Sequence, residues 1–277
     1  MAKGLALSIG LNAVDPQHYG GWSGHLTACE ADAQDMTQIA KSQDFTVTTL
    51  LTREANLETV QNRIKEAAAS LRGGDTFMLT YSGHGGQLPD LNHDEPDGLD
   101  ETWCLFNGEL VDDQLYTLLG AFQEHVRIIV LSDSCHSGSV VKQAYYHGTA
   151  DARKSAMGDL PRYRCMPPEV ILATYRKNKS FYDPILKARK MIKRQEAIKA
   201  SVLLISGCQD NQLSQDGNFN GLFTSQLLRV WDDGNFEGGY RKFHKQIVRC
   251  MPPDQTPDYF RIGIQNAAFE KAKPFTI

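Results

Sequence analysis

Two short polar clusters each follow an apolar run of the chain, and together they hold the side chains needed to activate a thiol. The run 76–81 leads into Ser82-Gly83-His84-Gly85, and the run 126–131 leads into Asp133-Ser134-Cys135. A thiol attacks a carbonyl as its thiolate, and a nearby imidazole can remove the proton. The pattern predicts Cys135 as a nucleophile and His84 as its base, with no residue in the sequence to orient His84.

Glycines beside both clusters leave backbone N–H groups open to a substrate. Such N–H groups can hold the negative oxygen that develops when a nucleophile attacks a peptide carbonyl. We expect the N–H groups of Gly85 and Cys135 to form this oxyanion hole.

Alternating strands and helices are expected to position the two clusters. Short apolar or β-branched runs predict strands, and apolar residues at helical spacing predict helices, one of them capped by Asn56. This alternation indicates an α/β fold with a mostly parallel sheet, whose strand ends meet along one edge. The expected strands are 3–11, 45–51, 76–81, 126–131, Val170–Ala173 and Val202–Ile205, and the expected helices are 25–41, 57–71, 112–124, 221–231 and 240–248.

The 277 residues, 41% hydrophobic and 22% charged, fit one globular domain. We divide it into 1–141, which carries the two clusters, a basic insertion 142–200, and 201–277. The insertion holds 14 basic and 5 acidic residues within a chain of net charge −4. Basic segments often bind nucleic acid, but prolines interrupt this one and it lacks base-stacking repeats, so we do not expect a nucleic-acid partner.

The cysteines and the hydropathy pattern indicate a cytoplasmic protein. The six cysteines form no C-x-x-C pair and no dense framework, so neither a zinc site nor a disulfide scaffold is expected. No apolar run reaches the length of a membrane span or of a signal peptide.

Other functions for a strand-end cysteine or for such a sheet are less well supported. A phosphatase loop needs Arg six residues after the cysteine, and position 141 is Val. No glycine-rich phosphate-binding motif follows a strand, so no organic cofactor is expected. A catalytically dead domain that acts as a scaffold fits poorly with the presence of both His84 and Cys135.

The paired clusters resemble those of the caspase-like cysteine peptidases, in the form found in metacaspases and bacterial orthocaspases. Ser-Gly-His-Gly and Asp-Ser-Cys-His-Ser-Gly carry the resemblance, with His84 and Cys135 51 residues apart. Similar features continue in Ser206–Gln212 and Asn220–Thr224. The resemblance implies a caspase-like fold with a six-stranded, mostly parallel sheet, a protein or peptide substrate, a monomer, and the possibility of an upstream activator protein.

Metacaspases cleave after Arg or Lys, and the resemblance implies which residues recognise that side chain here. Asp133 stands two residues before Cys135, Ser82 stands two before His84, and Asp32 lies in a matching segment after the first strand. Two carboxylates that face one cavity repel each other unless a cation lies between them. The alternative is that Asp32 solvates its helix and Asp133 pairs with the basic insertion.

An acidic stretch, 90–101, holds six carboxylates in twelve positions. Its match to an EF-hand loop fails, because position 6 is Glu95 rather than Gly and a strand precedes it. The resemblance instead implies an activating Ca²⁺ held by Asp100, Asp112 and Asp113. Lys142 departs from the family pattern of ligands, so a solvated acidic loop remains an alternative.

The basic insertion also predicts self-cleavage. An exposed polar stretch is a common site of proteolytic nicking. Cleavage after one of its basic residues could free the substrate site, and a solvated basic helix is the alternative. The candidate positions are Lys187, Arg189, Lys190 and Arg194.

Overall fold

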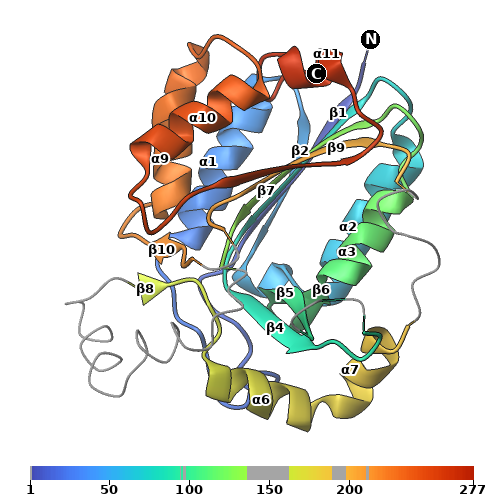
Figure 1. The fold of residues 1–277 in the computed structure, drawn as a ribbon, viewed down its shortest axis with the longest axis vertical. Coiled ribbons are helices and arrows are strands. Elements are labelled where there is room, and N and C mark those ends of the chain that lie inside the picture. The colour runs from blue at the N-terminus through green and yellow to red at the C-terminus, as the bar shows by residue number, and fades with distance from the viewer. Residues whose placement is uncertain (1, 94, 96–97, 136–161, 189–197, 210–211) are drawn as a thin grey trace.

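The fold is built on one twisted sheet, seen edge-on at the centre of the computed structural model (Figure 1). The structure describes residues 2–93, 95, 98–135, 162–188, 198–209 and 212–277. The strands of the central sheet are β1 (Gly4–Gly10), β2 (Thr46–Leu51), β3 (Thr76–Ser82), β7 (Arg127–Asp133), β9 (Ser201–Ser206) and β11 (Asp258–Gly263). They are ordered β11-β9-β7-β3-β1-β2, and all neighbours are parallel except β11, which pairs antiparallel with β9.

Helices cover both faces of this sheet, which explains why its central strands are buried along almost their whole length. All seven residues of β3 are buried. The helices are α1 (Cys29–Ser42), α2 (Leu57–Ser70), α3 (Asp112–Gly120), α6 (Pro168–Lys177), α7 (Lys179–Leu186), α9 (Leu222–Trp231), α10 (Tyr240–Cys250) and α11 (Ala267–Lys271), with 3₁₀ turns at Thr52–Glu54 and Asp232–Gly234. Figure 1 places α1, α9 and α10 on one face and α2 and α3 on the other.

Two smaller sheets lie at the carboxyl ends of the central strands. The three strands of one are β4 (Gly85–Pro89), β5 (Leu99–Leu105) and β6 (Gly108–Val111), and a two-stranded ribbon joins β8 (Arg162–Tyr163) to β10 (Gln215–Asp216). The sequence analysis missed both sheets, because strands this short and rich in glycine or charge carry little periodic signal. They build much of the site described below.

Most of the expected elements are present. Asn56 caps α2 as predicted, since its side chain accepts a hydrogen bond from the N–H of Thr59 at 2.9 Å. The expected strand Val170–Ala173 is wrong, because these residues lie in α6. Pro167 and Pro168 begin this helix, and Val170 and Ile171 pack on a small cluster around Tyr19 rather than in the sheet.

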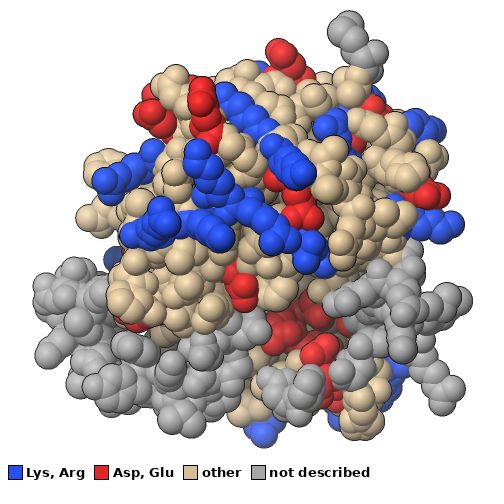
Figure 2. All heavy atoms as spheres, turned by 45° about the horizontal axis from the view of Figure 1, so that its top comes forward, with Lys and Arg blue, Asp and Glu red and all other residues tan. Residues whose placement is uncertain are grey.

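Charge is distributed unevenly over the surface. Figure 2, in which the end of the molecule with α11 comes toward the viewer, shows Lys and Arg side chains forming a band across that end. This is the opposite end of the sheet from the strand ends that lead to His84 and Cys135 (Figure 1). No helix among the described residues has the length and apolar character needed to cross a membrane.

Candidate active site

Strand register brings the two predicted reactive side chains to the same edge of the sheet. β3 and β7 are parallel neighbours in which Ser82 pairs with Asp133, and His84 and Cys135 each follow two residues later. The backbones are in close contact beyond the strands, since a Cβ atom added to Gly85 would lie 1.7 Å from the carbonyl oxygen of Cys135. Glycine is therefore required at position 85.

His84 is oriented by a backbone carbonyl. Its ring is buried, its Nε2 lies 2.9 Å from the carbonyl oxygen of Gly24, and its centroid lies 4.6 Å from that of the Trp22 ring. A carbonyl oxygen can only accept, so Nε2 carries the hydrogen and the lone pair of the neutral ring is on Nδ1. The sequence offered no orienting residue because the group that does this is main chain, and any residue type at position 24 supplies a carbonyl.

Cys135 lies in a closed environment. Its side chain is 1% exposed, and its Sγ accepts a hydrogen bond from the N–H of Ser214 at 2.8 Å. Burial raises the pKa of the Cys135 thiol well above its usual value, and contact with Cys165 raises it further. The thiol is therefore protonated in this arrangement.

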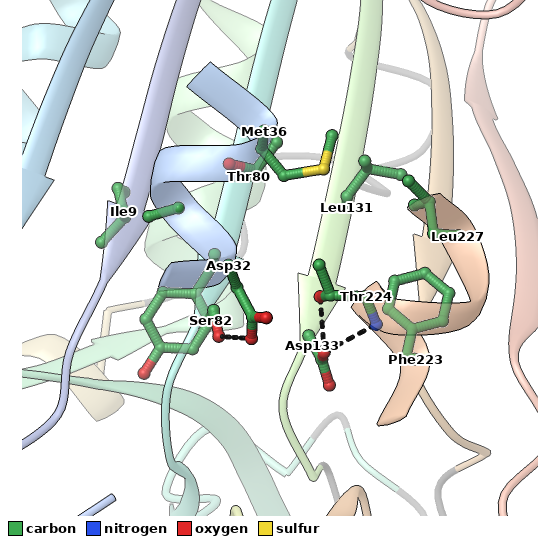
Figure 3. A pocket seen from close by; sticks show the side chains of 12 residues that line it. Ile9, Asp32, Met36, Thr80, Ser82, Leu131, Asp133, Phe223, Thr224 and Leu227 are labelled. Atoms are coloured by element: carbon green, nitrogen blue, oxygen red, sulfur yellow. Dashed lines mark hydrogen bonds between the residues drawn. The ribbon is translucent and has the colours of Figure 1, made fainter. Parts of the chain in front are cut away.

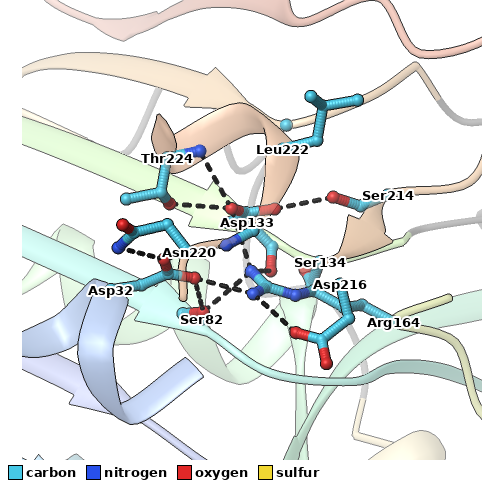
Figure 4. Close-up of polar contacts among 12 residues, drawn as sticks. Asp32, Ser82, Asp133, Ser134, Arg164, Ser214, Asp216, Asn220, Leu222 and Thr224 are labelled. Carbon is cyan, nitrogen blue, oxygen red and sulfur yellow. Dashed lines mark hydrogen bonds and ion pairs between the residues drawn. The ribbon is translucent and has the colours of Figure 1, made fainter. Parts of the chain in front are cut away.

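Arg164 occupies the space between the predicted recognition residues (Figure 4). Its side chain is 0% exposed. Its guanidinium lies 2.7 Å from Asp32, 2.9 Å from Asp133 and 3.0 Å from Asp216. The same group donates to Ser82 Oγ at 2.8 Å. Burial alone would lower the pKa of Arg164, but these carboxylates outweigh it and hold the pKa above its usual value.

Hydrogen bonds from neighbouring elements orient the carboxylates. Asp32, at the start of α1, accepts from the N–H of Gly221 and from Asn220 Nδ2, both at 3.0 Å. Asp133 accepts from Ser214 Oγ at 2.6 Å and from Thr224 Oγ1 at 2.7 Å. The two carboxylates flank a pocket whose inner wall is apolar (Figure 3); its lining includes Ile9, Met36, Leu131, Phe223 and Leu227.

Asp216 is a third acidic partner of the Arg164 guanidinium, and the sequence analysis did not find it. It lies in β10, and its second carboxylate oxygen accepts from both the N–H and the hydroxyl of Thr27, at 2.8 and 3.0 Å. These bonds direct the other oxygen at Arg164. A single acidic residue in a polar loop offers no pattern from which this role could be predicted.

The backbone of Arg164 is held as firmly as its side chain. Its carbonyl oxygen accepts from the N–H groups of Gly85 at 2.9 Å and Cys135 at 3.1 Å, the two donors predicted for the oxyanion hole. Its N–H donates to the carbonyl of Ser214 at 2.9 Å, and the N–H of Met166 donates to Gly85 at 2.8 Å. The segment 162–166 therefore crosses the site in extended form.

The three residues predicted to bind calcium lie together at the base of α3. Oxygen atoms of Asp100, Asp112 and Asp113 all lie within 4.8 Å of one another, and Asp100 is fully buried. Asn92 donates from Nδ2 to Asp113 at 3.1 Å, while its own buried Oδ1 has no hydrogen-bond partner among the described residues. Lys142 lies outside the described residues.

Of the four predicted self-cleavage positions, the structure describes one, Lys187, and its contacts lie outside the site. Lys187 directly follows α7, its side chain is 60% exposed, and it pairs with Asp183 at 2.8 Å. Arg189, Lys190 and Arg194 lie outside the described residues.

Comparison with known proteins identifies the family. The sequence profile of the family described as "Caspase domain" matches residues 3–269. The chain belongs to the caspase-domain family. Its curated relatives include Metacaspase-1 of Schizosaccharomyces pombe, 27% identical over 252 residues, and Metacaspase-1 of Kluyveromyces lactis, 29% identical over 256 residues. The alignments cover 81% and 80% of this chain but only 58% and 56% of those proteins.

Solved structures support the same conclusion about the fold. The crystal structure of protein GSU0716 from Geobacter sulfurreducens matches with a TM-score of 0.89 and 59% identity, over 99% of both chains. Caspase-1 from Spodoptera frugiperda matches with a TM-score of 0.56 and 12% identity, over 99% of this chain and 92% of that one, so it shows the fold alone. The predicted caspase-like fold with a mostly parallel six-stranded sheet is confirmed, and the resemblance to metacaspases holds for this caspase domain.

Proposed function

We propose that this caspase domain is a cysteine endopeptidase that cleaves peptide bonds after Arg or Lys, with Cys135 as nucleophile and His84 as base. One observation carries the proposal. A single residue, Arg164, has its guanidinium among three carboxylates while its carbonyl oxygen accepts from two N–H groups, one of them that of Cys135 itself. This is how a substrate residue must lie if the bond after it is to be attacked.

The charge of the pocket supports selection of a basic side chain. Burial raises the pKa of Asp32 above its usual value and outweighs the Arg164 guanidinium, which lowers it, while the carboxylate of Asp133 raises it further; the ionised form of these crowded acids therefore depends on a cation between them. A guanidinium can donate to several carboxylates at once from its planar fork, which favours Arg over Lys. An acidic side chain would meet like charge in this pocket and would be rejected.

The proposed reaction is acyl transfer. His84 accepts the Cys135 proton at Nδ1, because Nε2 is engaged with the Gly24 carbonyl. The thiolate attacks the substrate carbonyl, and the N–H groups of Gly85 and Cys135 stabilise the oxyanion. His84 then protonates the leaving amine, and water hydrolyses the thioester.

Fluorogenic peptides that differ only in the residue before the reporter test this function. We expect turnover of Arg peptides, slower turnover of Lys peptides and none of Asp peptides. Cys135→Ala and His84→Ala should reduce kcat by at least about 10³-fold, since nucleophile and base act as a unit. A domain that acts only as a binding module would give no turnover with any peptide, and equal turnover of Arg and Asp peptides would contradict the proposed pocket.

We further propose that calcium binds to Asp100, Asp112 and Asp113. Three converging carboxylates and the amide oxygen of Asn92, which lacks a hydrogen-bond partner among the described residues, suit a hard cation that prefers oxygen ligands. A bound ion would neutralise repulsion between β5 and the first turn of α3, next to the sheet that begins at Gly85.

Calorimetric titration of the Cys135→Ala protein with Ca²⁺ measures this binding without any reaction. We expect saturable binding that Asp100→Asn weakens at least about tenfold, because a ligating charge is lost. Asp44→Asn, which alters an exposed carboxylate in the turn between α1 and β2, is the matched control. Equal titration curves for Asp100→Asn and the unsubstituted site would show that these carboxylates do not bind the ion.

A further inference from the structure

The segment around Arg164 is held on both sides of one peptide bond, the bond between Arg164 and Cys165. On the amino side, Tyr163 and Arg162 pair antiparallel with Gln215 and Asp216. On the carboxyl side, Cys165 forms a parallel bridge with Gly85, whose carbonyl accepts from the N–H of Met166. Strand addition of this kind is a common way for proteins to bind extended peptides.

We propose that residues 162–166 are an internal substrate, which fills the site in the uncut chain and is cleaved by the same chain between Arg164 and Cys165. This rests on the proposed peptidase function and adds the bond, the regulation and the sequence that the site accepts. The uncut enzyme is then closed to other substrates, and the first cut is the step that allows the segment to leave.

A purely structural arginine would not need this combination of contacts. A buried guanidinium requires carboxylate partners, and Asp32, Asp133 and Asp216 provide them. It does not require its own carbonyl to lie between the N–H groups of Gly85 and Cys135. Side-chain and main-chain contacts that converge on one residue are the arrangement expected of a site that selects that residue and acts on the bond that follows it.

The neighbouring residues are placed as parts of a recognition sequence. Tyr163 packs beside the small apolar cluster of Cys135, Cys165 and Leu213, so the residue before the basic one contacts the nucleophile's surroundings. Gly221 leaves space for the guanidinium, since an added Cβ would lie 2.5 Å from Arg164 Cζ. The site therefore favours substrates with an aromatic or apolar residue followed by Arg.

The cleavage step balances with water as the second reactant. The Cys135 sulfur bonds to the carbonyl carbon of Arg164, and the bond from that carbon to the Cys165 nitrogen breaks. The proton that His84 removed from the thiol goes to this nitrogen, which becomes a new amino terminus. Water then breaks the thioester, leaving a carboxylate on Arg164 and restoring the thiol of Cys135.

The state of the thiol agrees with a closed, waiting site. In the uncut arrangement burial keeps Cys135 protonated, and a protonated thiol is a weak nucleophile. Departure of the segment 162–166 would remove Cys165 from the side of Cys135 and admit water. Reaction with the first, internal substrate is therefore expected to be slow, and reaction with later substrates faster.

Intact-mass measurement and amino-terminal sequencing of the purified chain, with and without calcium, test the cleavage. We expect fragments 1–164 and 165–277, with Cys165 as the new first residue. Cys135→Ala and Arg164→Ala should stay whole at this bond, and Arg164→Lys should be cut at least about tenfold more slowly because it loses the planar fork. Lys187→Ala is the matched control and should be cut like the unsubstituted chain.

Arg164→Ala could fold poorly, and slow cleavage could hide the difference between variants. A measurement of peptide binding, which needs no cleavage, tests closure of the site in either case. A fluorescent peptide of the sequence Arg-Tyr-Arg-Cys-Met is titrated into the uncut Cys135→Ala chain and into the Cys135→Ala, Arg164→Lys chain. We expect at least about tenfold tighter binding to the second, in which the internal segment is held less well. Equal affinity in the two chains would overturn closure of the site.

A parallel assay with an Arg fluorogenic peptide separates failure of this inference from failure of the proposed function. Turnover of the peptide by a chain that is never cut after Arg164, or that is cut only after Lys187, Arg189, Lys190 or Arg194, would overturn the internal substrate and leave the peptidase. Absence of both peptide turnover and chain cleavage would overturn both.

Discussion

Arg164 and Lys187 belong to the same basic insertion, yet their surroundings are opposite. The Arg164 side chain is fully buried among three carboxylates, whereas that of Lys187 is 60% exposed and pairs with one neighbour on its own helix, Asp183. An exposed basic stretch predicts where a foreign protease can cut. Under the proposed function, the contacts around a bond predict where the chain would cut itself.

The comparison also joins two interpretations that the sequence analysis treated as alternatives. Asp133 was expected either to form a pocket for a basic side chain or to pair with the basic insertion. It pairs with Arg164 of the insertion, as the second interpretation expects, and recognition of a basic substrate side chain by the same carboxylate stays a prediction. The pairing is informative because Ser82 and Asp32, predicted for the same pocket, contact the same guanidinium.

The largest effect that separates the two basic residues should be on stability. In the Cys135→Ala background, Arg164→Ala is expected to lower the free energy of unfolding by about 3 kcal/mol, because it leaves buried carboxylates without their cation. The loss stays at the lower end for a broken buried pair, since a released segment lets water reach the acids. Lys187→Ala should change stability by less than about 0.5 kcal/mol.

Urea unfolding followed by tryptophan fluorescence measures both variants. Arg164→Lys serves as a second control, because it keeps a positive charge and should recover part of the loss. If Arg164→Ala and Lys187→Ala were equally stable, the buried contacts around Arg164 would contribute nothing to the uncut chain.

The next effect separates the carboxylates that face the two basic residues. Asp32→Asn should lower kcat/KM for an Arg peptide by about 100-fold, because truncating the charge of a desolvated pair costs about 2–5 kcal/mol. The amide oxygen can still accept from Gly221, so the fold should be retained. Asp183→Asn, which alters the half-buried partner of Lys187 and Tyr175, should leave kcat/KM unchanged.

Steady-state kinetics with Arg and Lys peptides checks this result, and circular dichroism checks the fold. A loss of similar size for Asp183→Asn would mean that the effect is not specific to the pocket.

How much the sequence could predict depended on the kind of signal each part carries. Strands β1, β3 and β7 and helix α2 follow from long apolar runs and helical spacing. His84, Cys135, Asp32, Asp133 and Ser82 lie together as the motifs and the resemblance led us to expect, because parallel neighbours in register deliver their ends to one edge.

The parts that were missed depend on contacts between distant segments. The Gly24 carbonyl acts through the main chain, so its residue type gives no signal. Asp216 lies in a two-residue strand and Arg164 directly follows another, both in a polar region, and their roles exist only where 162–164 meets 214–216. Val170–Ala173 was misread because an apolar run of four fits a strand or a helix face equally well.

Glu109 is a buried acid without a cationic partner among the described residues, in contrast to the carboxylates that pair with Arg164. Glu109 is fully buried, forms no ion pair among the described residues, and burial raises its pKa to about 7 despite a hydrogen bond from Thr102 at 2.6 Å. In the unfolded chain Glu109 has the ordinary glutamate pKa of about 4.5. Between about pH 4.5 and 7, the folded state therefore binds the proton more tightly than the unfolded state does. Stability should therefore fall as pH rises from about 4.5 to 7.

Glu109→Gln removes this titration and should raise the free energy of unfolding by about 2 kcal/mol at pH 8, with little change at pH 5. Thermal unfolding of the two proteins across this pH range gives the measurement. A constant difference at all pH values would indicate a packing effect rather than the charge of Glu109.

The smallest effect concerns the neutral member of the pocket. Ser82 Oγ donates to Asp32 at 2.7 Å and accepts from Arg164 at 2.8 Å, so it links an acid to its cation without charge of its own. Ser82→Ala should lower kcat/KM for an Arg peptide by about tenfold, since a hydrogen bond to a charged group contributes about 1.5–3 kcal/mol and part of it is recovered by water. The effect on a Lys peptide should be smaller, because an ammonium lacks the fork that reaches Ser82 and two carboxylates together.

Ser70→Ala, at the end of α2, is the matched control. An equal loss for Arg and Lys peptides would show that Ser82 supports the fold of the pocket rather than recognition of the guanidinium.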